Sequence, residues 1–293
     1  MTEILSTNKT RSLKRELDAL VSTFDASFLS TDPLHFVHGY KRDRDREIAG
    51  LIASCLAYGR VDGIKKSVGR VLGAMGKSPY EFTLNFNPAE GLRLFDGFVH
   101  RFSGPKEITC LIYFVKQMIM ANGSIGGFFM KGFVAGDESI KAALSAFSEN
   151  ALSLDSFPVY GAKKLPKKAG VRFFFPNPND KSACKRLNLY LRWMVRRGDS
   201  LDFGIWKKVN PAQLVIPLDT HIARISKNIG LTTLRSPGWS MAEEITSALR
   251  KLNPKDPVRY DFALCRLGIL DRCPKKKDAL KCEKCLIRKV CVL

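Results

Sequence analysis

The chain has 293 residues, enough for one large domain or two lobes with ample core, so it needs neither a metal nor disulfides merely to fold. Its 48 lysines and arginines outnumber its 28 aspartates and glutamates, which favours a polyanionic partner such as nucleic acid. The most apolar stretch, 108–120, is too short to span a bilayer, and residues 1–10 lack the apolar region of a secretory signal. We therefore expect a cytoplasmic, reducing setting without membrane contact, in which eight cysteines do not form four disulfides.

Apolar residues recur at helical spacing along most of the chain, and no run alternates as a strand does. Helices are predicted over 11–29, 45–58, 61–75, 106–121, 138–147, 182–197, 219–229, 240–252 and 256–270. Three of them carry a start signal: Asp219 or Thr220 as a cap, Ser240 with Glu243 as a capping box, and Asp256 before Pro257. The fold class is all-α.

The longest loop, 157–180, combines basic and aromatic side chains. Its basic residues are Lys163, Lys164, Lys167, Lys168 and Arg172, and three phenylalanines follow at 173–175. This pattern suits a nucleic-acid surface, and a solvated loop with a hydrophobic anchor gives the same pattern.

Four of the eight cysteines cluster near the C-terminus as Cys273-x8-Cys282-x2-Cys285-x5-Cys291. The others, Cys55, Cys110, Cys184 and Cys265, are scattered and are typical of small buried residues. Four thiolates this close together can surround one metal centre. Zinc and a [4Fe–4S] cluster both accept four cysteines, so the spacing alone leaves the metal open.

The cysteine spacing resembles the C-x6-C-x2-C-x5-C motif of the endonuclease III class of helix-hairpin-helix DNA glycosylases, with two extra residues in the first gap. The resemblance implies a [4Fe–4S] cluster, with zinc as the alternative. In that family the first gap presents basic residues to DNA phosphates. The gap here, 274–281, contains four lysines, and Lys275, Lys276 and Lys277 are accordingly expected to bind DNA.

The segment 217–224, which reads PLDTHIAR, is similar to the family's V-D-T-H-x-x-R segment and makes Asp219 the candidate catalytic carboxylate. Cleavage of an N-glycosidic bond develops positive charge on the sugar. A nearby anion can stabilise that charge or deprotonate an attacking nucleophile. Asp219 is equally suited to cap the helix that follows it.

The segment 183–188 keeps the K-x-x-N part of the pattern that carries a nucleophilic lysine in bifunctional members of the family. Lys185 is therefore expected either to attack the sugar and form a Schiff base or to contact phosphate. The family's L-P-G-V-G hairpin is replaced here by 175–182. Further DNA contacts are expected from Lys181, Ser182 and Arg186.

Residues 47–75 resemble the family's helix pair around a Q-x-T-x-V turn, where a side chain fills the space left by a flipped base. The turn here reads Ala-Tyr-Gly-Arg-Val over 57–61. Tyr58 or Arg60 could fill that space, since a planar side chain can stack between bases. Tyr58 is equally suited to the core.

The resemblance runs from about residue 46 to residue 293 and implies two helical lobes of the helix-hairpin-helix glycosylase type. One comprises 1–45 with 206–293 and carries the cluster loop 273–291, and the other comprises 46–205. The implied function is excision of a flipped damaged or modified base from double-stranded DNA by a monomer, with AP-lyase activity if Lys185 is the nucleophile. The alternatives are a non-catalytic iron–sulfur DNA-binding protein and a zinc-stabilised RNA-binding protein.

Overall fold

The computed structural model describes residues 7–270, 272–274 and 276–292. These residues form α-helices, short 3-10 helices and loops; they include no strand, and one isolated bridge joins His100 to Ser103. The predicted all-α fold is confirmed at this level. No helix in the described part of the chain is long and apolar enough to cross a membrane.

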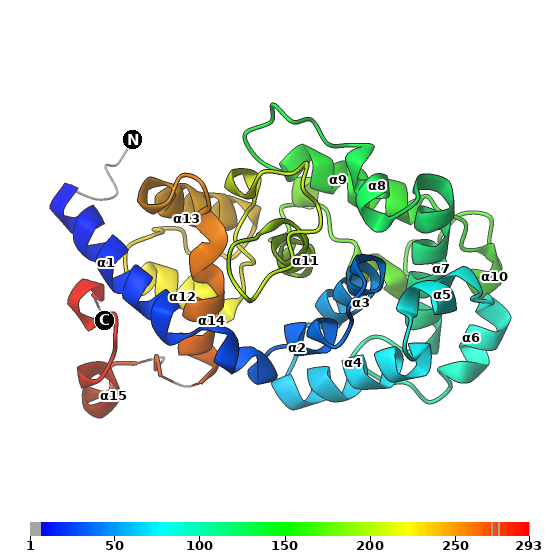
Figure 1. Cartoon of the computed structure of the whole chain (residues 1–293), viewed down its shortest axis with the longest axis horizontal. Coiled ribbons are helices and arrows are strands. Elements are labelled where there is room, and N and C mark those ends of the chain that lie inside the picture. The colour runs from blue at the N-terminus through cyan, green and yellow to red at the C-terminus, as the bar shows by residue number, and fades with distance from the viewer. Residues whose placement is uncertain (1–6, 271, 275, 293) are drawn as a thin grey trace. The chain divides into compact units, whose positions relative to one another are not determined.

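The chain divides into two compact units, shown in Figure 1. Unit 1 combines Met1–Phe28 with Lys181–Leu293, and unit 2 is the continuous segment Leu29–Asp180. The sequence prediction placed both boundaries later, after residues 45 and 205. Helix α11 (Lys185–Val195) belongs to unit 1 because its Arg192 forms buried ion pairs with Asp202 and Asp261.

Unit 2 is built around α7, an 18-residue helix that packs against α5, α6 and α8. Its helices are α2 (Leu34–His38), α3 (Asp43–Cys55), α4 (Val61–Met75), α5 (Pro79–Leu84), α6 (Pro88–Leu94), α7 (Pro105–Asn122), α8 (Ile125–Met130), α9 (Lys141–Leu152) and α10 (Phe157–Tyr160). The bounds of α4 are those predicted, and α9 lies a few residues later than predicted. The 3-10 helix η2 (Gly170–Phe174) packs on α7.

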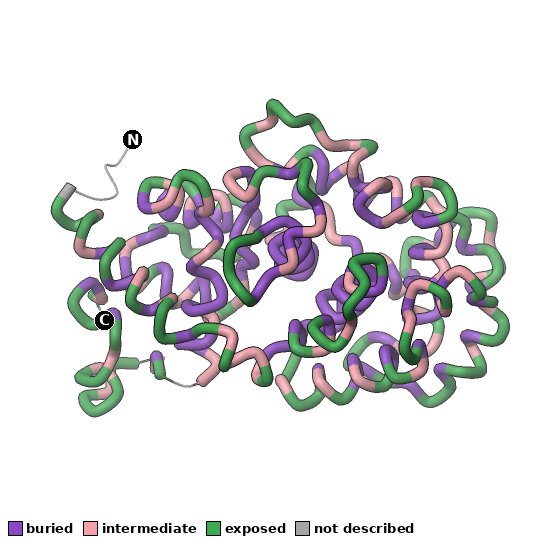
Figure 2. Tube along the Cα trace, viewed as in Figure 1, coloured by how far each residue is buried: buried purple, intermediate pink, exposed green. Residues whose placement is uncertain are grey.

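Unit 1 joins the first helix of the chain to its C-terminal third. Its helices are α1 (Thr7–Thr23), α11, α12 (Thr220–Asn228), α13 (Trp239–Leu252), α14 (Asp261–Ile269) and α15 (Ala279–Glu283), with 3-10 helices η4 (Pro211–Gln213), η5 (Pro257–Tyr260) and η6 (Arg288–Val290). Helix α1 packs on α13, α14 and η6 through Leu13, Leu17 and Leu20, which are fully buried. Helix α11 is buried along almost its whole length (Figure 2).

Two predicted helix starts were wrong in detail. Helix α13 begins at Trp239 with Gly238 at its N-cap, so Ser240 lies inside the first turn and forms no capping box. The buried Trp239 sets this start, because its backbone N–H donates to the carbonyl of Lys181 (3.1 Å). Asp256 does precede Pro257, but its carboxylate binds Arg196 instead of capping, and Pro257 opens η5 ahead of α14.

Candidate functional site

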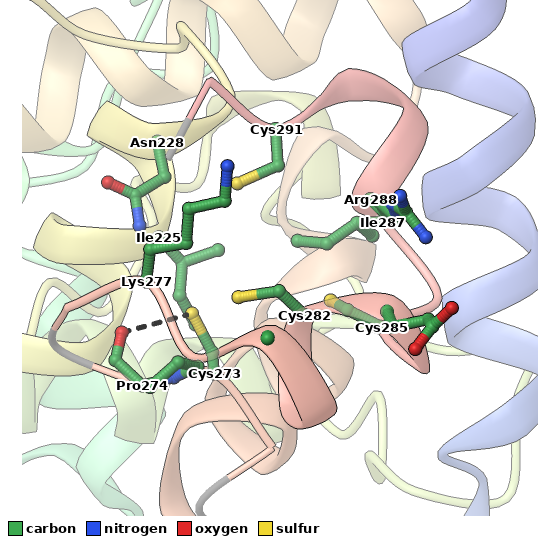
Figure 3. A pocket seen from close by; sticks show the side chains of 12 residues that line it. Ile225, Asn228, Cys273, Pro274, Lys277, Cys282, Cys285, Ile287, Arg288 and Cys291 are labelled. Carbon is green, nitrogen blue, oxygen red and sulfur yellow. Dashed lines mark hydrogen bonds between the residues drawn. The ribbon is translucent and has the colours of Figure 1, made fainter.

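The four clustered cysteines border one cavity of about 400 Å³ in unit 1 (Figure 3). Cys273 follows α14, Cys282 lies in α15, Cys285 follows α15, and Cys291 follows η6. None of the eight cysteines of the chain forms a disulfide. Four thiols from a short stretch of sequence are thus gathered around one space, as their clustering in the sequence suggested.

Local hydrogen bonds and two apolar anchors shape this segment. Asp278 caps α15 by accepting from the N–H of Lys281 (2.9 Å), and two tight turns then lead to Cys291. The side chains of Ile287 and Val290 are buried and fix the turns to the unit. The N–H of Val292 donates to the carbonyl of Asn228 (2.8 Å), which ties the segment to the end of α12.

The thiols are close enough to influence one another. Burial raises the pKa of Cys273; Arg224 opposes this effect, and the other three cysteines add to it. Burial also raises the pKa of Cys285, with further increases from Cys291 and Cys282. Four thiolates in this space would repel one another, and soft cationic iron or zinc is the kind of centre that relieves such repulsion.

The cavity combines the four thiols with one amide group. Among the described residues, no three His, Cys, Asp or Glu side chains are placed to hold a single metal ion. All four thiols nevertheless border the same cavity. The cavity also contains an amide donor, because Nδ2 of Asn228 is buried there without a hydrogen-bond partner among the described atoms.

Asp219 sits at the N-cap of α12, and the predicted capping role is confirmed. Its Oδ1 accepts from the backbone N–H groups of His221 and Ile222, both at 2.8 Å. Its Oδ2 accepts from the thiol of Cys265 at 3.7 Å. The carboxylate is therefore fixed in orientation, and the residue is only half-buried.

Lys185 at the start of α11 and Asp219 at the N-cap of α12 act on the same two buried groups of unit 1. Lys185 is the first residue of α11 and is half-buried. Burial raises the pKa of Cys265; the negative charge of Asp219 adds to the shift and Lys185 opposes it. Burial likewise raises the pKa of Asp261 to about 6. The charge of Asp219 raises this pKa further, and the charge of Lys185 lowers it. Asp219 and Lys185 thus share one electrostatic neighbourhood.

A buried network of ion pairs supports this neighbourhood, and sequence reasoning missed it. Arg192 binds Asp202 (3.3 Å) and Asp261, and Arg196 binds Asp202 as well. Arg196 also pairs with Asp199 (2.8 Å) and Asp256 (2.9 Å). The available signal was the four-residue spacing of Arg192 in α11 and Arg196 at its C-cap, followed closely by two aspartates.

The residues expected to bind DNA near Lys185 have different surroundings. Lys181 is exposed and Ser182 is half-buried, with its Oγ accepting from the N–H of Cys184 (3.3 Å). Arg186 is buried, with 7% of its surface exposed, so its side chain is not accessible to a phosphate at the surface. Lys181 and Cys184 both take left-handed φ values, 60° and 47°, so the turn before α11 is sharply bent.

The described lysines of the first cysteine gap lie at the surface. Lys276 and Lys277 are exposed, and Lys277 borders the cysteine cavity. Lys275 lies outside the described residues.

Tyr58 belongs to unit 2 and is held by its hydroxyl group. That group donates to the carbonyl of His100 (2.9 Å) and accepts from Oγ of Ser103 (2.8 Å). The ring is half-buried among other aromatic rings, whereas Arg60 is exposed at the N-cap of α4. Tyr58 is thus partly a core residue, as one of the two predictions for it stated.

Fold and site define a two-unit, all-α protein with a C-terminal four-cysteine site. The chain belongs to the family described as "Protein of unknown function (DUF2400)", whose model matches residues 32–270. The match ends before Cys273, so the cysteine site lies beyond it. No curated protein and no solved structure matches the chain.

Proposed function

We propose that this protein is an iron–sulfur DNA glycosylase of the helix-hairpin-helix type that removes a flipped damaged or modified base from double-stranded DNA. One observation carries the proposal: helix α12 links the two candidate sites. Asp219 caps its N-terminus, where Lys185 shares the same electrostatic neighbourhood. Ile225 and Asn228, near its C-terminus, border the four-cysteine cavity.

Asp219 and Lys185 are suited to complementary steps at the sugar. As the bond from C1′ to the base breaks, the base leaves with the electron pair, and the Asp219 carboxylate stabilises the positive charge left on the sugar. The neutral amine of Lys185 forms a bond to C1′, and Asp219 can take the proton that the amine releases. The C1′–O4′ bond then breaks and O4′ takes the proton held by Asp219, which leaves C1′ and the lysine nitrogen joined as a protonated Schiff base. Loss of a proton from C2′ expels the 3′-phosphate and so cleaves the strand.

Cys273, Cys282, Cys285 and Cys291 would hold a [4Fe–4S] cluster. All four thiols border one cavity of about 400 Å³, and the spacing of the cysteines resembles that of the iron–sulfur glycosylases, which favours a [4Fe–4S] cluster over zinc. When bound, the cluster would supply a rigid brace for the segment that carries Lys276 and Lys277.

The turn before α11 supports a phosphate contact next to Lys185. In the glycosylases the hairpin at this place contains glycines, which adopt left-handed φ values readily. Here Lys181 and Cys184 adopt them despite their side chains. A turn of this kind can aim backbone N–H groups at an anion, and Lys181 adds an exposed charge.

A non-catalytic iron–sulfur DNA-binding protein is the second candidate, and one observation favours it. Both carboxylate oxygens of Asp219 already have partners within the chain. A carboxylate committed to capping would serve the fold and leave the four-cysteine segment as the functional part.

The cluster is tested by anaerobic purification, absorption spectroscopy, and iron, sulfide and zinc analysis. We expect a brown protein with four irons and four sulfides per chain, lost on substitution of Cys282 by Ser and retained on substitution of Cys265 by Ser. A colourless protein with one zinc per chain would reject the cluster. That result would support the alternative of a zinc-stabilised RNA-binding protein.

Catalysis is tested by borohydride trapping on a panel of lesion-bearing duplexes. We expect a covalent adduct that Lys185→Ala abolishes and that the matched control Lys251→Ala, at another exposed lysine of unit 1, retains. DNA binding without base release on any lesion, and without any effect of Asp219 on base release, would establish the non-catalytic candidate instead.

A further inference from the structure

Three aromatic rings from distant parts of unit 2 form a cluster that the proposed chemistry does not use. Tyr58 follows α3, Phe102 lies between α6 and α7, and Phe173 lies in η2. The ring centroids of Tyr58 and Phe173 are 4.9 Å apart, those of Phe102 and Phe173 are 5.7 Å apart, and those of Tyr58 and Phe102 are 6.1 Å apart. Phe102 is 69% exposed and Phe173 is 40% exposed, so the cluster opens to solvent.

The fold holds Phe102 outward on a tight turn. His100 and Ser103 exchange both backbone hydrogen bonds (2.8 and 2.9 Å), which leaves Arg101 and Phe102 at the tip. Arg101 has a φ of 53°, a left-handed conformation that is unfavourable for a residue with a side chain. The base of the turn is fixed by the Tyr58 hydroxyl and by Nδ1 of the buried His100, which lies 2.9 Å from Oγ of Ser67. The exposure of Phe102 is therefore imposed by surrounding structure.

One cation contacts these rings, and others lie in the segments that carry them. The guanidinium of Arg101 is 5.3 Å from the centroid of Phe102, and its side chain runs past Gly59, where an added Cβ would lie 3.0 Å from Cδ of Arg101. Arg60 is exposed beside Gly59. The loop that leads to Phe173 adds four exposed lysines: Lys163, Lys164, Lys167 and Lys168. The carboxylate of Glu107, in the first turn of α7, accepts hydrogen bonds from the N–H of Gly104 and from the hydroxyl of Tyr160.

We propose that Tyr58, Phe102 and Phe173 form a stacking platform for an unpaired base of DNA. Flat apolar faces accept any base, and the surrounding cations complement the phosphates on either side of it. Bases inside an intact duplex are already stacked on both faces, so the platform selects DNA in which a base is unpaired. This inference rests on the proposed DNA-binding function and adds the DNA structure that the protein prefers.

The test compares two DNA duplexes that differ only by one bulged adenine, using the full-length protein and fluorescence anisotropy at fixed salt. We expect tighter binding of the bulged duplex. Phe102→Ala should reduce this preference by about fivefold or more, since stacking on one aromatic ring contributes roughly 1–3 kcal/mol per base. Phe102→Trp should retain it.

Phe157→Ala is the matched control, because Phe157 is another exposed phenylalanine of unit 2 (55%) outside the three-ring cluster. It should leave the preference unchanged. With 2-aminopurine at the bulge, the wild-type protein should also quench the fluorescence more than Phe102→Ala does. Equal preference in wild type and Phe102→Ala would overturn the platform while leaving DNA binding intact. Failure to bind either duplex would overturn the proposed function as well.

Discussion

Asp219 combines a structural and a proposed chemical role in one side chain. Its Oδ1 satisfies two backbone N–H groups that the first turn of α12 leaves without helical partners. Its charge is a separate property, because a neutral amide oxygen can accept the same hydrogen bonds. The two roles can therefore be separated by substitution.

Asp219→Asn should leave stability within about 0.5 kcal/mol of wild type, since Asn caps helices as well as Asp does. The same variant should lose base release, because it lacks the negative charge. Asp219→Ala should lose base release and also about 1 kcal/mol of stability. Denaturant unfolding of unit 1 can be followed by tryptophan fluorescence, because all three tryptophans of the chain (193, 206 and 239) lie in that unit. Base release by Asp219→Asn at the wild-type rate would exclude a catalytic role.

Asp261 predicts a pH dependence of the stability of unit 1. Burial raises its pKa to about 6, with Asp219 adding to the shift and Arg192 and Lys185 opposing it. A carboxyl whose pKa is higher in the folded than in the unfolded state favours folding below the unfolded value, and this contribution is lost as pH rises through 6. Between pH 5 and pH 7, wild type should lose about 1 kcal/mol of stability relative to Asp261→Asn.

The measurement is denaturant unfolding by tryptophan fluorescence at both pH values. Asp261→Asn keeps an oxygen that can accept from Arg192 and has no charge to titrate in this range. Parallel pH dependences of the two proteins would contradict the prediction.

At the scale of elements, helices could be predicted from the sequence more reliably than their first residues. Helix α4 has the predicted bounds because its apolar face and its start after a glycine turn are both local features. The starts near Ser240 and Asp256 were wrong because distant groups compete for the same atoms. The carbonyl of Lys181 fixes Trp239, and Arg196 takes the Asp256 carboxylate.

Glu47 of α3 makes a comparable long-range contact in unit 2. Its buried carboxylate accepts from the N–H groups of Ile125 (3.2 Å) and Gly126 (2.7 Å) at the start of α8. Glu47→Ala should destabilise unit 2 by roughly 2–3 kcal/mol, because it leaves two buried donors without an acceptor. Glu47→Gln, which keeps one oxygen, should cost less.

Circular dichroism separates this effect from unit 1. In Glu47→Ala the helical signal of unit 2 should be lost at lower denaturant, while the tryptophan transition stays at its wild-type midpoint. An unchanged circular dichroism curve would show that α8 does not depend on Glu47.

At the scale of the molecule, the candidate site could be predicted only where it is local in sequence. The four cysteines could be identified because 273–291 is one short segment. Asp219 and Lys185 were found by resemblance, on separate matches. The Arg192–Asp261 pair and the cluster of Tyr58, Phe102 and Phe173 draw residues from segments far apart, and a single sequence carries no signal of such pairings.

Unit 2 is continuous in sequence and has its own core around α7. The fragment 29–180 should therefore fold alone as a helical domain with one cooperative thermal transition. Circular dichroism and amide dispersion in a proton–nitrogen NMR spectrum would check this. A fragment with collapsed dispersion would show that unit 2 requires unit 1 for its structure.

The discontinuity of unit 1 sets an order of events during synthesis on the ribosome. Helix α1 is made before unit 2, yet α13 and α14, which pack on α1, emerge only after all of unit 2. Until then the apolar side of α1 has no native cover and is a natural target for a chaperone. The cysteine segment emerges later still and contacts α1 through η6. The surroundings of the cysteine cavity are therefore complete only after α1 and the cysteine segment have met.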